Sequence, residues 1–283
     1  MAEKVHHEPY RGPEIKSTRY RVTTPEQTVL HVHEGVELTY CVEGSFDYLV
    51  EGSRCTMEPG LLLVLRPGEA HRLVVEPGID GVRIVLQMTL AALDAMDPTG
   101  VLRRPFFGRP LGRLNLYRPA DFPTELYRLC FESLDDASSP LGETLERESK
   151  APCILGEVYK AYCGQMARGV RESADRSQIG RIITYINENL AQPMSLEEIS
   201  RRFFLSPSQL NRAFRRATGS SVWEYVTTKR LAVARGRIRA GIPAGKACTA
   251  SGFSDYSAFF RSYKAHFGVS PRQDAPAAEQ EYR

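Results

Sequence analysis

Two periods of hydrophobic positions divide this chain. Between residues 28 and 88, short apolar runs alternate with turns rich in Gly and Pro about every eight to ten residues, as is typical of an antiparallel sandwich or small barrel. The runs span residues 28–33, 36–44, 46–52, 61–71, 72–78 and 82–88. From residue 178 onward the apolar positions recur at helical spacing, with interruptions at Pro193, Gly219, Gly241 and Gly268. The pattern predicts an all-β part followed by an all-α part.

Two amphipathic helices are predicted between these parts, over residues 123–134 and 153–170. The residues expected on the apolar faces are Leu126, Leu129, Cys130 and Leu134 in the first helix and Leu155, Val158, Tyr162 and Met166 in the second. The polar segment 135–152 is typical of a connection between them. The helix pair belongs either to the local core or to a seam between two copies of the chain, and the pattern favours neither.

Composition narrows the class of protein. With 283 residues, 42% of them hydrophobic and 25% charged, the chain is long enough for two globular domains. It has no apolar run near the roughly 20 residues of a membrane-spanning helix, and residues 1–21 lack the apolar core of a secretory signal. The six cysteines form no C-x-x-C pair, so we expect reduced thiols in a cytoplasmic protein.

Charge is distributed unevenly along the chain. The net charge is only +3, yet residues 178–272 hold 15 Lys and Arg against 5 Asp and Glu, whereas residues 1–177 are net acidic. Such a division indicates that one part meets a polyanion and the other does not.

The stretch SLEEISRRFFLSPSQLNRAFRRATG has the layout of a helix-turn-helix. Ser195 is a predicted N-cap, and Ser206 and Pro207 begin a second helix on which Leu210 and Phe214 are core residues. Its other faces carry side chains that can contact DNA. These candidates are Ser208, Gln209, Asn211, Arg212, Arg215 and Arg216. Asn and Gln can pair with adenine and Arg with guanine in a major groove, while the remaining bases suit phosphates.

The stretch GFSDYSAFFRSYKAHFGVSP also predicts a capped helix with one buried side and one exposed polar side. Asp255 is the predicted N-cap of a helix whose buried side consists of Phe259, Phe260 and Tyr263. The candidate DNA contacts on the exposed side are Tyr256, Ser257, Arg261 and Lys264. The long basic helix predicted between the two units would hold the two reading helices at a spacing that suits successive major grooves.

Residues 178–272 resemble the C-terminal domain of AraC/XylS-type bacterial transcription regulators. The resemblance is carried by SLEEISRRFFLSPSQLNRAFRRATGSSVWEYV, KRLAVAR and SGFSDYSAFFRSYKAHFGVSP. It implies that base-facing positions are Ser208, Asn211 and Arg212 in the first unit and Tyr256, Ser257 and Arg261 in the second. Two departures stand out. The helix before Gly252 is small and contains Gly245, which predicts a looser second unit, and RQDAP replaces the family's usual Tyr-Arg after Pro271.

The N-terminal part contains HVHEGVELTYCVEG and PGLLLVLRPGEAH, which are similar to the two cupin motifs. Alternate residues of a strand share a face, so the side chains of these motifs can meet inside a barrel. One interpretation is a Zn, Fe, Mn or Ni site. Its ligands would be His31, His33, Glu37 and His71. The interpretation we favour is a pocket for a small polar effector without a required cofactor. Its residues would be His31, His33, Glu37, Tyr40 and His71.

The predicted fold class is α+β with two domains. The N-terminal domain is a cupin-like antiparallel β-barrel plus helices, and the C-terminal domain is all-α, with two helix-turn-helix units joined by a linker helix. The predicted segments are an arm (1–27), a sensor domain (28–120), a helical dimerisation region (121–177), the DNA-binding domain (178–272) and a disordered tail (273–283).

The leading hypothesis is therefore a cytoplasmic, sequence-specific transcription regulator, not an enzyme, which binds double-stranded promoter DNA as a homodimer. An effector, for which the family suggests a sugar, would control it, and RNA polymerase would be a further partner. It could be an activator or a repressor. The alternative is a metal-dependent cupin enzyme with an appended basic domain.

Overall fold

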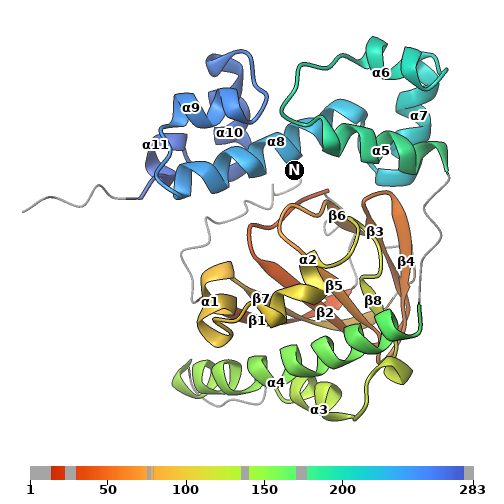
Figure 1. The fold of residues 1–283 in the computed structure, drawn as a ribbon, viewed down its shortest axis with the longest axis vertical. Helices are drawn as coiled ribbons and strands as arrows, with labels where there is room; N and C mark the ends of the chain where they lie inside the picture. The colour runs from red at the N-terminus through yellow and green to blue at the C-terminus, as the bar shows by residue number, and fades with distance from the viewer. Residues whose placement is uncertain are drawn as a thin grey trace, which may run out of the picture. The chain divides into compact units, whose positions relative to one another are not determined.

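The structure is a computed structural model that describes residues 14–22, 30–74, 78, 80–134, 140–169 and 177–276. The chain divides near residue 181 into a barrel unit and a helical unit (Figure 1). Predictions for the remaining residues, including the arm before residue 14 and the tail after residue 276, lie outside the described part.

The barrel unit contains two antiparallel sheets, as the turn spacing predicts. One sheet has the order β1-β7-β2-β5-β8 and the other the order β4-β3-β6. The strands are β1 (Ile15–Val22), β2 (Val36–Glu43), β3 (Phe46–Val50), β4 (Ser53–Met57), β5 (Leu62–Leu65), β6 (His71–Val74), β7 (Gly81–Met88) and β8 (Leu116–Tyr117).

Strands β1 and β4 do not follow the hydrophobic pattern of the other strands, because they lie at sheet edges. Strand β1 pairs with β7 from Ile15 opposite Met88 to Val22 opposite Gly81, so the predicted arm over residues 1–27 is wrong for this segment. Between its buried ends, β1 is largely half-buried or exposed, and β4 is similar. Polar residues are common on such edges, since they discourage pairing with other chains.

The unit has two hydrophobic cores, one on each face of the large sheet. On β5, Leu63 and Leu65 belong to the core between the sheets, whereas Leu62 and Val64 face the helices. The run LLVL is therefore apolar at every position because both faces of the strand are buried. The helices are α1 (Leu90–Met96), α2 (Arg104–Phe107), α3 (Leu126–Glu132) and α4 (Pro140–Ala167), together with the 3₁₀ turns η2 (Val101–Arg103) and η3 (Pro119–Asp121). Figure 1 shows α3 and α4 side by side, below the sheets in this view.

Helix α4 is longer than predicted. It begins at Pro140, so most of segment 135–152 is helical and is not a connection. Residues 146–150 are polar because they lie at least partly in solvent, and Glu146 and Lys150 form an ion pair of 3.1 Å across one turn. The predicted face of its second half is confirmed at Leu155, Val158 and Tyr162, which are buried.

The predicted apolar face of helix α3 is confirmed only in part. Cys130 and Leu134, just after the helix, are buried as predicted, but Leu126 and Leu129 are 41% and 54% exposed. Tyr127 and Phe131 are buried in their place. The two aromatic rings stack against Phe122 and Tyr40, respectively, and bury more apolar area than the leucines would.

The helical unit consists of seven helices within the described residues. They are α5 (Gln178–Glu188), α6 (Leu196–Arg202), α7 (Pro207–Thr218), α8 (Val222–Arg239), α9 (Ala244–Ala250), α10 (Tyr256–Phe267) and α11 (Pro271–Asp274). The pairs α6–α7 and α9–α10 are the two predicted helix-turn-helix units, and α8 runs between them (Figure 1). Helix α11 includes residues 273 and 274, so the predicted tail begins too early. None of the helices in the described ranges is long and apolar enough to cross a membrane.

Candidate functional site

The first helix-turn-helix unit is built on two capped helices. The Ser195 hydroxyl accepts a hydrogen bond from the Glu198 amide at 3.1 Å and begins α6. At α7 the cap is reciprocal: the Gln209 amide donates to Ser206 Oγ at 3.2 Å, and the Ser206 amide donates to Gln209 Oε1 at 2.9 Å. Gln209, a predicted base contact, therefore also caps the helix that carries it.

Helix α7 exposes nearly all of its predicted DNA contacts. Leu210 and Phe214 are fully buried, and the Phe214 ring meets Tyr225 of α8 edge to face at 5.4 Å. The predicted contacts that are exposed are Ser208, Gln209, Arg212, Arg215 and Arg216. Asn211 is half-buried, because its Oδ1 accepts a hydrogen bond from the Val222 amide at 3.2 Å. Asn211 thus ties α7 to the start of α8.

The second unit presents a similar surface. Asp255 caps α10 by accepting from the amides of Ser257 and Ala258 at 3.0 and 2.9 Å. The predicted contacts on this helix are all exposed: Tyr256, Ser257, Arg261 and Lys264. Phe259 and Tyr263 are buried as predicted, but Phe260 is 37% exposed, and Phe267, two turns beyond Phe259, takes the third buried position. The buried stripe follows a strict i, i+4 row, which leaves Phe260 beside it.

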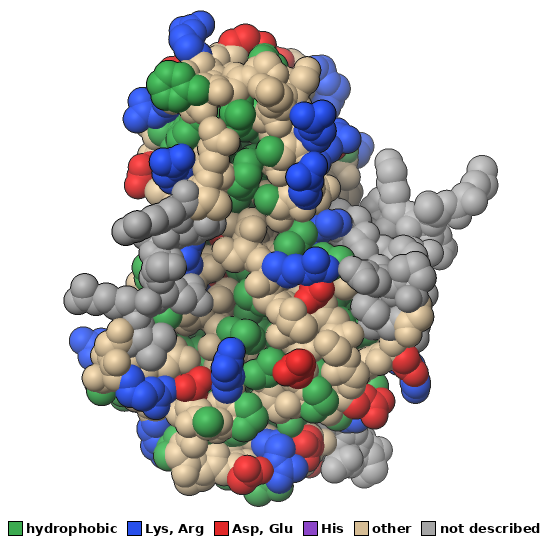
Figure 2. All heavy atoms as spheres, turned by 90° about the vertical axis from the view of Figure 1, so that its right-hand side faces the viewer, with side chains coloured by type: hydrophobic (Ala, Val, Ile, Leu, Met, Phe, Trp, Pro, Cys, Tyr) green, Lys and Arg blue, Asp and Glu red, His purple; other side chains and the backbone are tan. Residues whose placement is uncertain are grey.

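The basic side chains of the helical unit fall into two groups. No acidic side chain of the described ranges pairs with any of the cations on the reading helices. These are Arg212, Arg215 and Arg216 on α7 and Arg261 and Lys264 on α10. On the face that Figure 2 shows, basic side chains gather over the helical unit, whereas acidic and basic side chains are interspersed over the barrel unit. Unpaired, exposed cations of this kind are available to phosphates and base edges.

The second group of bases supports the fold. Arg230 of α8 is buried and donates to the carbonyl oxygens of Leu190 and Gln192, each at 2.8 Å, so it holds the end of the segment that follows α5. Arg235 and Arg239 pair with Asp274 at 2.7 and 2.9 Å. The positive charge of residues 178–272 is therefore only partly available to a polyanion.

Asp274 is a structural residue that sequence reasoning missed. It lies in the segment RQDAP, where the sequence departs from the resemblance described above. Its side chain also accepts a hydrogen bond from the Tyr263 hydroxyl at 2.8 Å. Burial would raise the pKa of Asp274, but Tyr263 and the two arginines together hold this pKa below its ordinary value. Nothing local in the sequence indicates these partners, because all of them come from other helices.

Helix α8 sets the distance between the reading helices. Its 18 residues correspond to a rod roughly 27 Å long at 1.5 Å per residue. Helix α7 packs at its start, through Asn211 and Phe214, and α9 and α10 pack along its second half, through Leu231, Ala234 and Ile238. The two reading helices therefore pack against different parts of one rod.

In the barrel unit, three histidines converge as the cupin-like motifs predict. The ligand nitrogens of His31, His33 and His71 lie within 4.8 Å of one another. His31 and His71 exchange backbone hydrogen bonds of 3.0 Å across a single bridge, which fixes their separation. Their ring centroids are 4.3 Å apart.

Glu37 lies beside this histidine cluster and is buried. Its Oε2 is 2.7 Å from His33 Nε2 and accepts a hydrogen bond of 2.7 Å from Gln87, while its Oε1 accepts one of 3.0 Å from Thr39. Burial alone would raise the pKa of Glu37, but the neighbouring histidines, His33 foremost, hold it well below its usual range. Glu37 is therefore a buried carboxylate among imidazoles.

Tyr40 does not belong to this group, and the predicted pocket is wrong in this respect. Along β2, Glu37 faces the space between the two sheets, whereas Val36, Leu38 and Tyr40 belong to the core against the helices. The Tyr40 hydroxyl donates to Glu132 of α3 at 3.1 Å. The parity of a strand places residues an odd number of positions apart on opposite faces.

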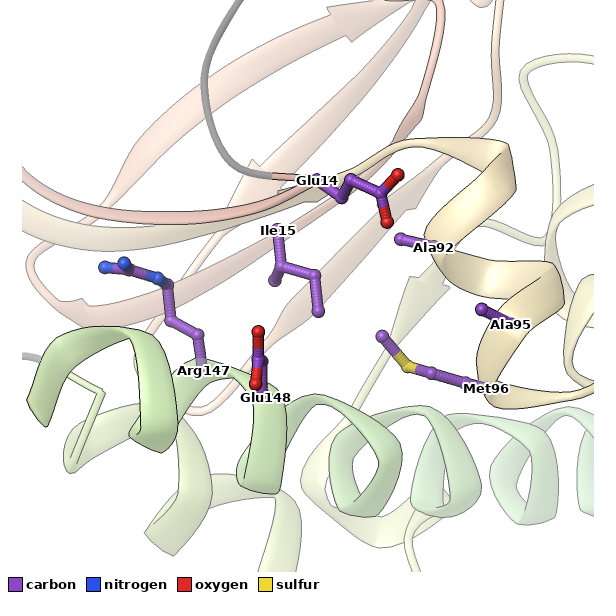
Figure 3. Close-up of a pocket in the computed structure, with 7 residues that line it drawn as sticks. All are labelled: Glu14, Ile15, Ala92, Ala95, Met96, Arg147 and Glu148. Carbon is purple, nitrogen blue, oxygen red and sulfur yellow. The ribbon is translucent and has the colours of Figure 1, made fainter. Parts of the chain in front are cut away.

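Two cavities that the described residues of the barrel unit form are not lined by any of the predicted pocket residues. One of about 420 Å³ lies between the start of β1, α1 and α4 (Figure 3). Ile15 and Met96 point into it, and charged side chains of Glu14, Arg147 and Glu148 surround it. The other, of about 580 Å³, lies between β4 and the segment around β8.

Comparison with known proteins supports both parts of this description. Residues 199–275 match a family model for a helix-turn-helix domain, and residues 20–84 match a model for a cupin domain. The chain is 25% identical to a probable transcriptional regulator, LumQ, from Photobacterium leiognathi, over 91% of this chain and 96% of that protein.

Two further relatives cover different shares of the chain. The multiple antibiotic resistance protein MarA of Salmonella typhimurium is 29% identical over 36% of this chain and 82% of its own length. The XylDLEGF operon transcriptional activator 1 of Pseudomonas putida is 22% identical over 95% of this chain and 83% of its own length. LumQ and the Pseudomonas putida protein are named as regulators of transcription. With a cupin domain followed by a helix-turn-helix domain, the chain resembles DNA-binding transcription regulators of the AraC/XylS type.

Proposed function

We propose that this regulator recognises a specific promoter sequence by placing α7 and α10 in successive major grooves of one duplex. The observation that carries the proposal is the pair of reading helices, both packed on the single rod α8, with five exposed cations. Among the described residues none of these cations forms an ion pair, although Glu224 and Asp255 lie near enough to interact with Arg215 and Arg261. Five such cations make phosphate and base contacts favourable and confer a strong dependence on salt concentration.

Arg212 is the first choice for a base contact on α7. It is exposed and unpaired, and the planar guanidinium group can bind the O6 and N7 atoms of a guanine at once. Asn211 and Gln209 each use one side-chain oxygen within the protein, but both retain amide donors. Arg261 has the corresponding role on α10.

The barrel unit is proposed to sense a small molecule. An effector that binds one arrangement of the barrel unit more tightly than another shifts the population between DNA-binding states. We further propose that the protein acts as a homodimer, contacts RNA polymerase and activates transcription, in line with the Pseudomonas putida relative that is named as an activator.

Selection of duplexes from a random DNA pool by the full chain tests the proposal. The wild-type protein should enrich two short motifs about one helical turn apart. Arg212→Ala should lose discrimination at one base pair in the first motif, and Arg261→Ala at one in the second, each by about 1–3 kcal/mol. The exposed residue Arg272 on α11 provides the control Arg272→Ala. Enrichment of no motif, or identical motifs for all four proteins, would contradict the proposal.

A second candidate property is metal binding at the histidine cluster, and the buried nitrogen of His71 favours it. His71 Nδ1 is 2.8 Å from the Glu69 carbonyl oxygen, to which it donates, so the neutral ring carries no proton on Nε2. This Nε2 is buried and has no hydrogen-bond partner in the described part of the chain. Burial lowers the pKa of His71 to about 4, so its lone pair is available near neutral pH.

The residues present fit a divalent transition metal. Two ligand atoms that are each about 2.1 Å from one metal ion lie at most about 4.2 Å apart, so the observed spread of up to 4.8 Å requires only a small contraction. His31, His33, His71 and Glu37 would supply three imidazoles and a carboxylate, a set that suits Zn, Fe, Mn or Ni. Gln87 and Glu69 would orient Glu37 and His71.

Metal analysis of the purified chain tests this second proposal. After loading with each metal and dialysis, we expect one equivalent per chain and a higher melting temperature. His71→Gln should abolish both, whereas His266→Gln, in the other unit, should change neither. Metal contents well below one equivalent for every ion, or equal contents in wild type and His71→Gln, would exclude the site.

A further inference from the structure

The cavity of about 580 Å³ beside β8 is of a size that accommodates a small organic molecule. It lies between the edge strand β4, the turn that leads into β5, and the segment from Gly112 to Pro119. None of the residues predicted for effector binding takes part in it. The lining residues that matter here are Arg54, Cys55, Asn115, Leu116 and Arg118.

Asn115 provides an unused hydrogen-bond donor in this cavity. The residue is only 2% exposed, and its Nδ2 has no hydrogen-bond partner among the described residues. Its backbone is held in place because its carbonyl oxygen accepts a hydrogen bond from the Val64 amide at 2.7 Å. Buried amide nitrogens without a partner are rare and costly, so a ligand oxygen at this position would be favourable.

The rest of the wall is rigid. Arg109 and Glu69, both fully buried, form a two-pronged ion pair of 2.7 and 2.8 Å. Glu69 Oε1 also accepts a hydrogen bond from the Gly112 amide at 2.5 Å. The segment that leads to Asn115 is therefore anchored to the loop before β6, and the donor is held ready for a ligand.

The rim of the cavity carries charges of both signs, from Arg54, Arg118 and Glu58. Arg54 is already bound to Asp47 at 2.6 Å. The exposed guanidinium group of Arg118 has no ion-pair partner in the described ranges. A ligand carboxylate can pair with Arg118 while a second ligand oxygen accepts from Asn115. These contacts suit a hydroxy or keto acid whose carboxylate lies beside Arg118 and away from Glu58.

The segment around the cavity is also bonded to the last turns of α4. Gln165 donates to the Leu116 carbonyl oxygen at 3.4 Å and to Asp121 Oδ2 at 3.1 Å. Arg168 pairs with Asp121 at 2.5 Å. Since the chain continues from α4 to the helical unit, a ligand that shifts β8 or η3 acts on the helix that precedes the DNA-binding domain.

We infer that this cavity is the effector site and that its ligand is a small hydroxy or keto acid, held by Asn115 and Arg118. This inference rests on the proposed regulatory function for its purpose, but binding itself can be measured without DNA.

Cys55 makes the test site-specific, because its half-buried thiol lines the cavity and is not part of a disulfide. Iodoacetamide labelling of the full chain, followed by peptide mass spectrometry, would give the rate at each cysteine with gluconate, lactate or glucose present. Gluconate and lactate are open-chain hydroxy acids, whereas glucose is a neutral sugar that is mainly a closed ring. An acid at twice its Kd should slow Cys55 labelling about threefold, since one third of the chains remain free. The exposed thiols of Cys153 and Cys163 on α4 are internal controls and should keep their rates.

The variants Asn115→Leu and Arg118→Gln should remove the protection while the control cysteines still react as in the wild type. Absence of protection by both acids, equal protection by glucose, or undiminished protection in both variants would each overturn the inference. A chain that selects a DNA motif but shows no protection of Cys55 would leave the proposed function standing without this site. Protection without any DNA preference would refute the proposed function and retain the site.

Discussion

The two helix-turn-helix units share a layout but are held in place differently. Each reading helix is capped by the residue before it, Ser206 for α7 and Asp255 for α10. In the first unit, two residues of the reading helix add further contacts: Gln209 accepts from the Ser206 amide, and Asn211 binds the start of α8. In the second unit, the further contact comes from a neighbouring helix, because Asp274 of α11 binds Tyr263. The second reading helix thus keeps Tyr256, Ser257, Arg261 and Lys264 exposed.

This difference shows that a reading helix can be positioned by its own polar side chains or by a neighbouring element. The sequence predicts a looser second unit on the basis of Gly245 and the small residues around it. The structure adds an anchor, Asp274, that the prediction did not include. Stability measurements on variants of each unit can therefore separate the two modes of positioning.

The largest effect is expected from Asp274→Ala. It removes three hydrogen-bonded partners at once and leaves Arg235 buried without its counter-charge, so we expect a loss of about 3 kcal/mol in the free energy of unfolding. Chemical denaturation of the full chain would measure it. Arg272→Ala, which alters an exposed neighbour, is the control and should change stability by less than about 0.5 kcal/mol.

The loss of stability in Asp274→Ala should also depend on pH. The folded-state pKa of Asp274 lies below its ordinary value, so its stabilising contribution is present above the unfolded-state pKa and disappears as the pH falls through the folded-state pKa. The difference between wild type and variant should be complete at neutral pH and should shrink in acid. A difference that is constant down to acidic pH would show that Asp274 acts by packing alone.

The next largest effect is expected at Gly252, which lies between α9 and α10 in the second unit. Its φ is +91°, and an added Cβ would lie 2.7 Å from the Leu190 carbonyl oxygen and 2.8 Å from Arg230 Nε. Gly252→Ala should cost about 2–3 kcal/mol, since it combines backbone strain with displacement of Arg230. Gly241, with φ of +85° and no atom within 4 Å of an added Cβ, is the matched control. Equal losses for Gly252→Ala and Gly241→Ala would mean that the contact with Arg230 is unimportant.

In the first unit, Gln209→Ala should lower stability by about 0.5–1 kcal/mol because the hydrogen bond from the Ser206 amide is lost, while the Ser206 hydroxyl still caps α7. The DNA motif that this variant selects should be the same as for the wild type, and its affinity should be lower for all DNA sequences alike. Ser208→Ala, at an exposed neighbour that caps nothing, should leave stability unchanged. A changed preference at one base pair without loss of stability would instead establish Gln209 as a base contact.

The smallest effect is expected from Gly245→Ala in α9. The residue lies in a helix and no atom is within 4 Å of an added Cβ, so the substitution should stabilise the second unit by about 0.5–1 kcal/mol. Thermal melts of the full chain would compare this variant with Gly252→Ala. The melting temperature should rise for Gly245→Ala and fall for Gly252→Ala. Destabilisation by Gly245→Ala would indicate that α9 needs the freedom of glycine.

Prediction from sequence succeeded where the signal is local. Helices α6, α7, α8 and α10 follow from caps and from apolar residues spaced along one face, and most reading-face residues are exposed as expected. It failed at the edge strand β1, whose polar residues obscure the alternation, and at the first part of α4, where residues 146–150 are polar and lie at least partly in solvent. It also assigned part of the buried faces of α3 and α10 wrongly, because Tyr127 and Phe131 in α3 and Phe267 in α10 are buried where Leu126, Leu129 and Phe260 were expected.

The sequence by itself determined that a β-rich part precedes a helical part, and which residue types each reading helix presents. Only the tertiary structure decided which arginines remain available: Arg230, Arg235 and Arg239 bind partners within the protein, whereas Arg212 and Arg261 do not. It also decided that Tyr40 leaves the histidine cluster and that Asn115 faces a cavity. Spacing along the chain sets the face on which a side chain lies, but its partners come from segments distant in sequence, and those become neighbours only when the chain folds.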